Sequence, residues 1–148
     1  MNRRKAVVED NKKVVLGCWE AANRRDLSAF DGFYAENAVY YDSQGEVRGR
    51  ENIKAHLQRY MTAAPDLKVT VEDIFGEGDR VFSRVRMQGT HTGPFGEIPP
   101  TGRSIDIRWT MNACRVEGGK IVEEWEICDT LDIFRQLGLI QAPVPASA

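Results

Sequence analysis

The chain has 148 residues, of which 42% are hydrophobic and 28% charged, as in ordinary globular domains. Its net charge is −2 with both signs mixed along the chain, so we expect no nucleic-acid partner, which usually requires a clustered basic face. No apolar run approaches the ~18 residues of a membrane span, the N-terminus lacks the apolar stretch of a signal peptide, and the three cysteines form no Cys-x-x-Cys motif. These features predict a single cytoplasmic domain over residues 1–148, with residues 1–5 and 142–148 frayed and no membrane contact.

Apolar residues at helical spacing predict a long amphipathic helix over Lys5–Asn23. A short second helix should follow over Leu27–Tyr34, because Asp26 is a suitable N-cap. The same spacing predicts a helix over Arg50–Ala64, which Pro65 should end.

The rest of the chain has the alternation and β-branched residues of strands. We expect strands over Ala38–Asp42, Leu67–Phe75, Arg80–Thr90, Arg103–Val116 and Lys120–Cys128, a Gly- and Pro-rich loop over Thr92–Gly102, and a last short helix over Leu131–Leu137 ending at Gly138. This order predicts an α+β fold in which the N-terminal helices pack on a curved antiparallel sheet. Such a sheet forms a cone around a central cavity.

The turn Glu117–Lys120 decides which side chains of the last two strands share a face. A three-residue loop with a left-handed Gly119 puts polar side chains on one face: Arg108, Thr110, Asn112, Cys114, Val122, Glu124, Glu126 and Cys128. The other face then carries Trp109, Met111, Ala113, Ile121, Glu123, Trp125 and Ile127. A slip of one residue would separate Asn112 from Glu126.

Two interpretations of these faces remain open. In the first, the apolar face is the core and the polar face meets water. In the second, the polar face lines a cavity and another subunit covers the apolar face. The second requires a homodimer or homotetramer, because Trp109, Met111, Trp125 and Ile127 would otherwise leave a large apolar surface in water.

Several short motifs of the C-terminal half resemble one family. They are Gly89-Thr90-His91-Thr92-Gly93, Ile98-Pro99-Pro100-Thr101-Gly102, Arg115 to Ile121, and Arg135-Gln136-Leu137-Gly138. Together they resemble the SnoaL-like polyketide cyclases, which belong to the nuclear-transport-factor-2-like (ketosteroid-isomerase-like) superfamily. The resemblance covers about Pro65 to Leu139, and the N-terminal third matches mainly in layout.

The resemblance implies the cone fold and a cofactor-free enzyme that closes a ring of an aromatic polyketide ester by an intramolecular aldol reaction. It places the family's catalytic aspartate on Glu126, a pocket histidine on Asn112 and a pocket glutamine on Thr110. Asparagine does not titrate, and glutamate is one methylene longer than aspartate. The more general expectation is therefore proton transfer next to a carbonyl group of an apolar substrate, polycyclic substrates included.

Four polar side chains are candidates for this chemistry. Glu126 is the expected acid/base, because an apolar cavity raises the pKa of a carboxyl group. His91, at the start of the Gly/Pro loop, could orient a substrate carbonyl or fix the loop. Asp129 could be an acid at the pocket mouth or the N-cap of the last helix. Arg108 could bind a substrate carboxylate or ester, or lie on the surface.

Further side chains are expected to bind substrate by lining the cavity, although core packing alone would also explain them: Trp19, Tyr41, Met61 and Cys128. We expect no metal site, because the two histidines lack ligand spacing to other ligand types. Two other functions remain open on this fold. One is a non-catalytic module that binds a hydrophobic ligand, and the other is an epoxide-opening hydrolase, which would need an Asp-Arg-Asp set.

Overall fold

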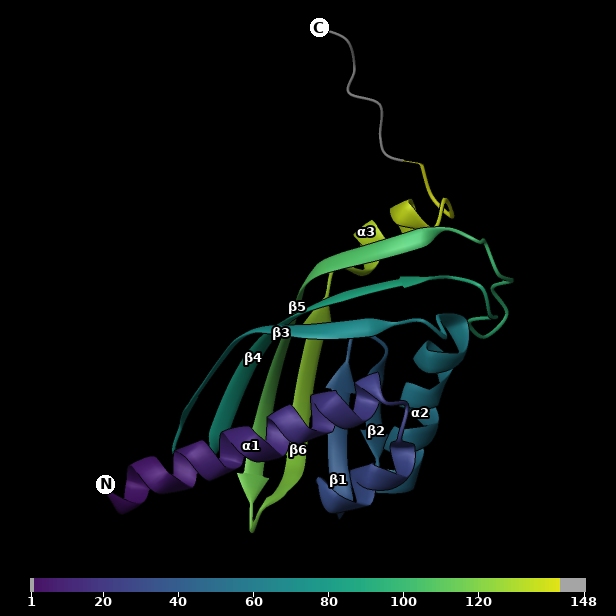
Figure 1. Cartoon of the computed structure of the whole chain (residues 1–148). Coiled ribbons are helices and arrows are strands. Elements are labelled where there is room, and N and C mark those ends of the chain that lie inside the picture. Colours follow the sequence, from purple (N-terminus) through teal and green to yellow (C-terminus); the bar gives the residue numbers. More distant parts are fainter. Residues whose placement is uncertain (1, 142–148) are drawn as a thin grey trace, which may run out of the picture.

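The computed structural model describes residues 2–141, so the fraying predicted for residues 142–148 lies outside the described part of the chain (Figure 1). The helices are α1 (Arg3–Asn23), the 3-10 helix η1 (Leu27–Gly32), α2 (Arg50–Ala63) and α3 (Thr130–Gln136). The strands are β1 (Tyr34–Asp42), β2 (Gly45–Arg48), β3 (Lys68–Glu77), β4 (Arg80–Thr90), β5 (Ser104–Glu117) and β6 (Lys120–Cys128). Helix α1 begins two residues before the predicted start, because the Asn2 side chain accepts a hydrogen bond from the Arg4 N–H and caps the helix.

The strands form one six-stranded sheet in the order β2-β1-β6-β5-β4-β3. The α+β class and the curved sheet are therefore confirmed. Two details differ from the prediction. Strand β1 runs parallel to β6, whereas the other pairs are antiparallel. The segment after Asp42 is a tight hairpin that leads into β2, a strand that was not among those predicted.

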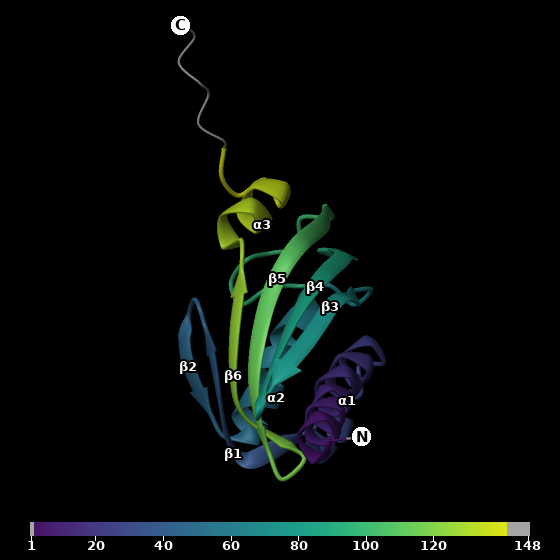
Figure 2. The ribbon, with the colours of Figure 1, turned by 90° about the vertical axis from the view of Figure 1, so that its left-hand side faces the viewer.

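The sheet bends strongly and does not close (Figure 2). Its register shifts at one point in each of the pairs β1–β6, β3–β4, β4–β5 and β5–β6. Such bulges bend a strand and increase its twist, which gives the sheet a concave inner face. Helix α1 packs against β3 and β4, α2 packs against β1, and α3 packs against the far end of β5 (Figure 1).

Helix α1 contributes one buried stripe to the core, formed by Asn11, Val15, Cys18 and Ala21 at spacings of three and four residues. On the same helix, Gly17 lets η1 approach closely, because a Cβ atom there would lie 2.6 Å from the ring of Phe33. The core therefore sits between α1, η1 and the narrow end of the sheet, and the wide end is left for a cavity.

The last hairpin reaches the predicted register by a different route. Glu117 pairs with Lys120 across a two-residue turn, in which Gly118 and Gly119 both have positive φ. The predicted three-residue loop is therefore wrong. An extra residue, Val122, then bulges between the pairs Val116–Ile121 and Arg115–Glu123. The bulge restores the predicted pairing from Arg115–Glu123 onward, and Asn112 lies opposite Glu126.

The two bulges also correct the predicted faces. Ile121 was expected on the outer face, but it is buried inside because the bulge at Val122 reverses its direction. At the bulge between β4 and β5, two residues of β5, Arg108 and Trp109, lie opposite a single residue of β4. Both of them are exposed, with 73% of the Arg108 side chain in solvent. Arg108 therefore does not share the inner face with Thr110, as had been expected.

Candidate active site

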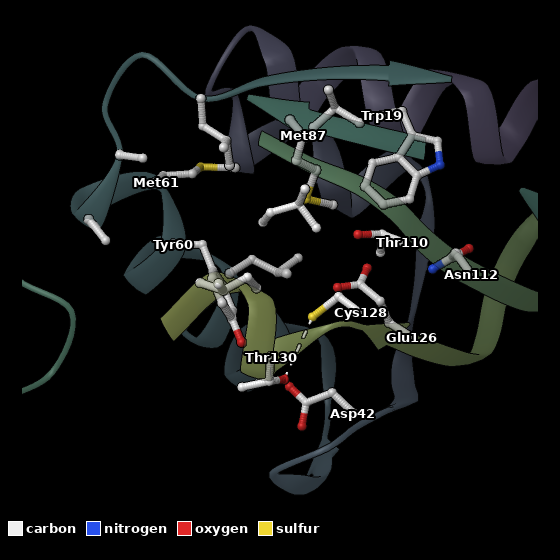
Figure 3. Close-up of a pocket in the computed structure, with 18 of the residues that line it drawn as sticks. Trp19, Asp42, Tyr60, Met61, Met87, Thr110, Asn112, Glu126, Cys128 and Thr130 are labelled. Carbon is white, nitrogen blue, oxygen red and sulfur yellow. Dashed lines mark hydrogen bonds between the residues drawn. The ribbon is translucent and has the colours of Figure 1, made fainter. Parts of the chain in front are cut away.

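A cavity of about 190 Å³ lies between the concave face of the sheet and the helices (Figure 3). Its walls come from α1, α2, β1, β4, β5, β6 and α3. Most of the lining is aliphatic or aromatic, including Trp19, Leu57, Met61, Met87, Ile107, Ile133 and Phe134. An apolar cavity with a few polar groups is the usual form of a small-molecule site.

Glu126 is one of the few polar groups in this wall. It lies on the inner face of β6, and its side chain extends into the cavity together with Thr110 of β5 (Figure 3). The residue is partly exposed, in contrast to Glu124 two positions earlier, which is buried. A ligand in the cavity can therefore contact the Glu126 carboxyl group.

The surroundings of Glu126 favour its neutral form. Burial in the apolar cavity raises the pKa of this carboxyl group to about 8, and the negative charges of Glu124 and Asp42 act in the same direction. Tyr40 and Asn112 oppose the shift by hydrogen bonding. The result is a carboxyl group that can exchange a proton near neutral pH.

A network of buried side chains holds Glu124, which lies two positions before Glu126 on β6. The Tyr34 hydroxyl donates a hydrogen bond to Glu124 Oε2, and the Asn112 amide donates one to Glu124 Oε1. The Cys114 thiol in turn donates to Asn112 Oδ1 at 3.1 Å. Burial raises the pKa of Glu124, whereas the hydrogen bonds from Tyr34 and Asn112 lower it. Asn112 thus forms hydrogen bonds with both glutamates. Its amide therefore has little capacity left to donate to a substrate oxygen.

Five of the residues singled out from the sequence as substrate contacts or catalytic groups around Glu126 lie in the cavity wall: Trp19, Met61, Thr110, Asn112 and Cys128. The Thr110 hydroxyl is fully buried and has no hydrogen-bond partner among the described residues. A buried polar atom without a partner is unusual, and here it lies beside a cavity that a ligand could fill.

Three candidates lie outside the cavity. Tyr41 points outward from β1 and stacks on Trp125, with ring centroids 5.5 Å apart. Arg108 is exposed for the reason given above. Asp129 caps α3, because its Oδ1 accepts a hydrogen bond from the Asp132 N–H at 2.9 Å. The capping interpretation of Asp129 is thus correct, and Asp129 is not among the residues that line the cavity.

His91 lines the cavity at a point remote from Glu126. Ser83 pairs with Asn112, which in turn pairs with Glu126 on the next strand. His91 lies eight residues after Ser83 in the chain. The side chain is only 3% exposed; its Nδ1 accepts a hydrogen bond from the Thr101 N–H, and its Nε2 has no partner among the described residues. His91 therefore fixes the loop through Thr101, and it lines the cavity several strand positions away from Glu126.

Sequence reasoning missed one pair at this site. Asp42, the last residue of β1, lines the cavity, and its Oδ2 lies 2.9 Å from Nε2 of His56 on α2. The His56 ring also packs against the rings of Tyr40 and Tyr60. The motif Tyr40-Tyr41-Asp42 at a strand end was visible in the sequence, but nothing in it indicated that His56 would be the partner.

Two other features of the described residues bear on ligands and location. Residues 2–141 contain no group of three or more His, Cys, Asp or Glu side chains arranged to hold a metal ion. None of the described helices combines the length and the apolar character needed to cross a membrane.

Comparison with known proteins gives the family. A model of the SnoaL-like polyketide cyclases matches residues 12–137. The chain belongs to this family. No curated protein sequence matches it significantly. The nuclear-transport-factor-2-like fold implied by the resemblance is shared with solved SnoaL-like structures.

Three solved structures illustrate the likeness. IdmH of Streptomyces antibioticus, proposed to be a polyketide cyclase, is 33% identical, with a TM-score of 0.75 over 86% of this chain and 98% of that one. AclR of Streptomyces galilaeus, proposed to be a hydroxylase, is 28% identical, with a TM-score of 0.80 over 90% and 99%. A SnoaL-like protein of Jannaschia sp. CCS1 is 22% identical, with a TM-score of 0.86 over 95% and 100%. Similar SnoaL-like chains thus carry different proposed reactions.

Proposed function

We propose that this protein is a cofactor-free enzyme that moves protons next to a carbonyl group of an apolar small molecule, in an aldol cyclisation or an isomerisation. The observation that carries the proposal is Glu126, a carboxyl group that faces an apolar cavity and has a pKa of about 8. General acid/base catalysis works best when the pKa of the catalytic group lies near the operating pH. Proton transfer of this kind requires no cofactor.

The other polar groups suggest how a substrate would lie. We assign the unpartnered hydroxyl of Thr110 to the developing enolate oxygen, because it lies in the wall beside Glu126. Asn112 keeps Glu124 and Glu126 in place. His91 would contact a part of the substrate away from the reacting carbon. The cavity is smaller than the ~300–1,000 Å³ typical of drug-sized ligands, which favours a one- or two-ring reacting portion.

The two alternative functions have less support. Epoxide opening with an Asp-Arg-Asp set would need an arginine at the cavity, and no described lysine or arginine lines it. A module that only binds apolar ligands has no use for Glu124 and Glu126 in its wall, because burying a carboxyl group costs free energy. The two glutamates therefore favour catalysis over simple binding.

The test uses 1-tetralone, a neutral bicyclic ketone whose α-hydrogens exchange slowly in neutral water. The protein is incubated with it in deuterated buffer, and loss of the α-hydrogen signal is followed by NMR. We expect catalysed exchange by the wild-type protein and a loss of about 100-fold or more in Glu126→Gln, the usual contribution of a general acid or base.

The matched control is Glu123→Gln. Glu123 lies on the same strand but faces outward, where it pairs with Arg115. This variant should exchange tetralone at the wild-type rate. Equal exchange by wild type, Glu126→Gln and a blank without protein would contradict the proposed function.

We also propose that a second copy of the chain covers the outer face of β5 and β6, which would make the protein a homodimer or a homotetramer. Trp109 and Ile127 on this face are 63% and 71% exposed, and Met111, which is also exposed, lies opposite Ile127 in the β5–β6 pair. Contiguous apolar patches on a sheet usually mark an interface. A cytoplasmic location fits the three free cysteines, which a reducing compartment keeps as thiols.

A further inference from the structure

The end of β1 places a second carboxylate beside Glu126. In the parallel pair of β1 and β6, Tyr40 lies opposite Glu124 and Tyr41 lies opposite Trp125. One step further along both strands puts Asp42 beside Glu126, and adjacent strands are ~4.8 Å apart. Side chains alternate along a strand, so Asp42 points inward as Tyr40 does, and it forms part of the cavity wall.

Asp42 is held in place by two hydrogen bonds. Its Oδ1 accepts the backbone N–H of Gln44 at 2.7 Å, and its Oδ2 lies 2.9 Å from His56 Nε2. The side chains of Asp42 and His56 are only 9% and 8% exposed. Both oxygens of Asp42 therefore have a hydrogen-bond partner, which fixes the carboxyl group in the cavity wall.

The surroundings of Glu126 differ from those of Asp42. Glu126 lies in the apolar part of the cavity, and the charges of Glu124 and Asp42 disfavour a further negative charge beside them. Figure 3 shows Asp42 and Glu126 on the same wall, with Cys128 between them in this view. Two carboxyl groups at one site, one hydrogen-bonded at both oxygens and the other in the apolar part of the cavity, can divide the roles of base and acid.

We propose that Asp42 is the base of this cavity and Glu126 is its acid, with His56 as the residue that positions Asp42. Asp42 removes a proton from the carbon next to the carbonyl group. The electrons of that C–H bond form the C=C bond of an enol, and the carbonyl oxygen takes the proton of Glu126. Asp42 then carries one proton more and Glu126 one fewer, and exchange with water restores both. This assignment rests on the proposed function. It divides the two proton transfers between Asp42 and Glu126, whereas Glu126 alone would otherwise make both.

Variants at Asp42 test the assignment with the tetralone exchange. Asp42→Asn keeps the size and polarity of the side chain but cannot accept the proton, and we expect at least a 100-fold loss of exchange. The control is Asp73→Asn, because Asp73 is an exposed aspartate that pairs with Arg84 on the sheet surface. Circular dichroism and thermal unfolding establish that each variant folds. Wild-type exchange in a folded Asp42→Asn overturns the proposal and leaves the proposed function intact.

His56 variants separate positioning from catalysis. His56→Gln retains a donor for Asp42 and should lose less exchange than His56→Phe, which retains none. Both should leave binding of tetralone within about threefold of wild type, because His56 does not line the cavity. If His56→Phe exchanges at the wild-type rate, His56 does not position the base.

The pH profile of the wild-type protein is a second measurement that needs no variant. If Glu126 must be protonated to act, the exchange rate falls as the pH rises through about 8. If Glu126 is itself the base, the rate rises over the same range. The titratable groups around Glu126 come from several elements: Cys18 of α1, Tyr40 and Asp42 of β1, His56 and Tyr60 of α2, Cys114 of β5, and Glu124 and Cys128 of β6.

Burial raises the pKa of the surrounding thiols and tyrosines, so they remain neutral across this range. A rising profile overturns the assignment of acid and base but keeps the proposed function. No exchange at any pH overturns both.

Discussion

The two faces of the β5–β6 hairpin differ in a way that reverses the usual rule for a sheet. The inner face carries Asn112, Glu124 and Glu126, whereas the outer face exposes Trp109 and Ile127. In most half-buried sheets the apolar face is inside. The inner face lines the cavity, and the reversal supports the proposals that this cavity takes a ligand and that a second copy of the chain covers the outer face.

The two faces also differ in what holds their charges. On the outer face, Glu123 pairs with Arg115 near solvent. On the inner face, Glu124 relies on Tyr34 and Asn112, which are neutral hydrogen-bond donors. Neutral donors compensate only in part for the loss of water, so the inner carboxyl groups destabilise the fold when they ionise.

The largest expected effect is on stability at high pH, and it compares Glu126→Gln with Glu123→Gln. The pKa of Glu126 is about 8 in the folded protein and close to 4.5 in the unfolded chain. Between these values the folded state binds more protons than the unfolded state, so wild-type stability falls as the pH rises through this window. Glutamine has no such proton. We expect Glu126→Gln to gain about 4 kcal/mol in stability relative to wild type between pH 5 and pH 9, because each pKa unit of the difference corresponds to about 1.4 kcal/mol.

Urea unfolding at pH 5 and pH 9 measures this difference. Glu123→Gln should lose about 1 kcal/mol or less at both values, as expected for a partly exposed ion pair. The same pH dependence in wild type and Glu126→Gln would show that Glu126 does not gain a proton on folding.

A second comparison uses adjacent residues of β5 that point to opposite faces. Asn112→Leu removes the amide that donates to Glu124 and leaves a buried carboxyl oxygen without a partner. We expect a loss of about 2 kcal/mol in the free energy of unfolding at pH 7. Met111→Leu, on the outer face, should change it by about 0.5 kcal/mol or less. Equal losses in both variants would mean that the network below Glu126 adds no stability.

A third prediction concerns the outer face. Ile127→Glu places a charge in the centre of the exposed apolar patch, and Leu131→Glu places one on α3 outside it as a control. Analytical ultracentrifugation should show an assembled wild-type protein, an assembled Leu131→Glu and a monomeric Ile127→Glu. A monomeric wild type at high protein concentration would remove the support for a dimer.

The smallest effect is expected for Arg108→Ala. The Arg108 side chain points to solvent, near Asp106. Exchange of tetralone should stay within about twofold of wild type. A large loss would mean that β5 rearranges when a ligand binds, with Arg108 turning toward the cavity.

The element order except for β2, most boundaries and the family could be predicted from the sequence, because they depend on local patterns and short motifs. The direction in which a single side chain points could not be predicted, because one bulge in a strand reverses that direction. Arg108 and Ile121 were misplaced for this reason, at the two bulges of β5 and β6. The pair Asn112–Glu126 was placed correctly because the bulge at Val122 offsets the shorter turn.

The Asp42–His56 pair shows a different limit. The two residues come from a strand and a helix that meet only in the folded chain. Nothing in the spacing of fourteen residues indicates that the two side chains are in contact, so the sequence did not single out His56 as a functional residue. The pairing of β1 with β6, which places Asp42 beside Glu126, is equally non-local.

The bulge at Val122 has a consequence for comparing relatives and for redesigning the chain. A two-residue turn followed by one extra strand residue gives the same side-chain directions beyond Glu123 as a three-residue turn without a bulge. Relatives can therefore exchange one arrangement for the other and keep the carboxyl group in the cavity. An alignment that places a gap at the glycine turn is correct only if the side chain at position 126 still points into the cavity. In a redesign, a loop at Gly118-Gly119 that is one residue longer should be combined with the deletion of Val122.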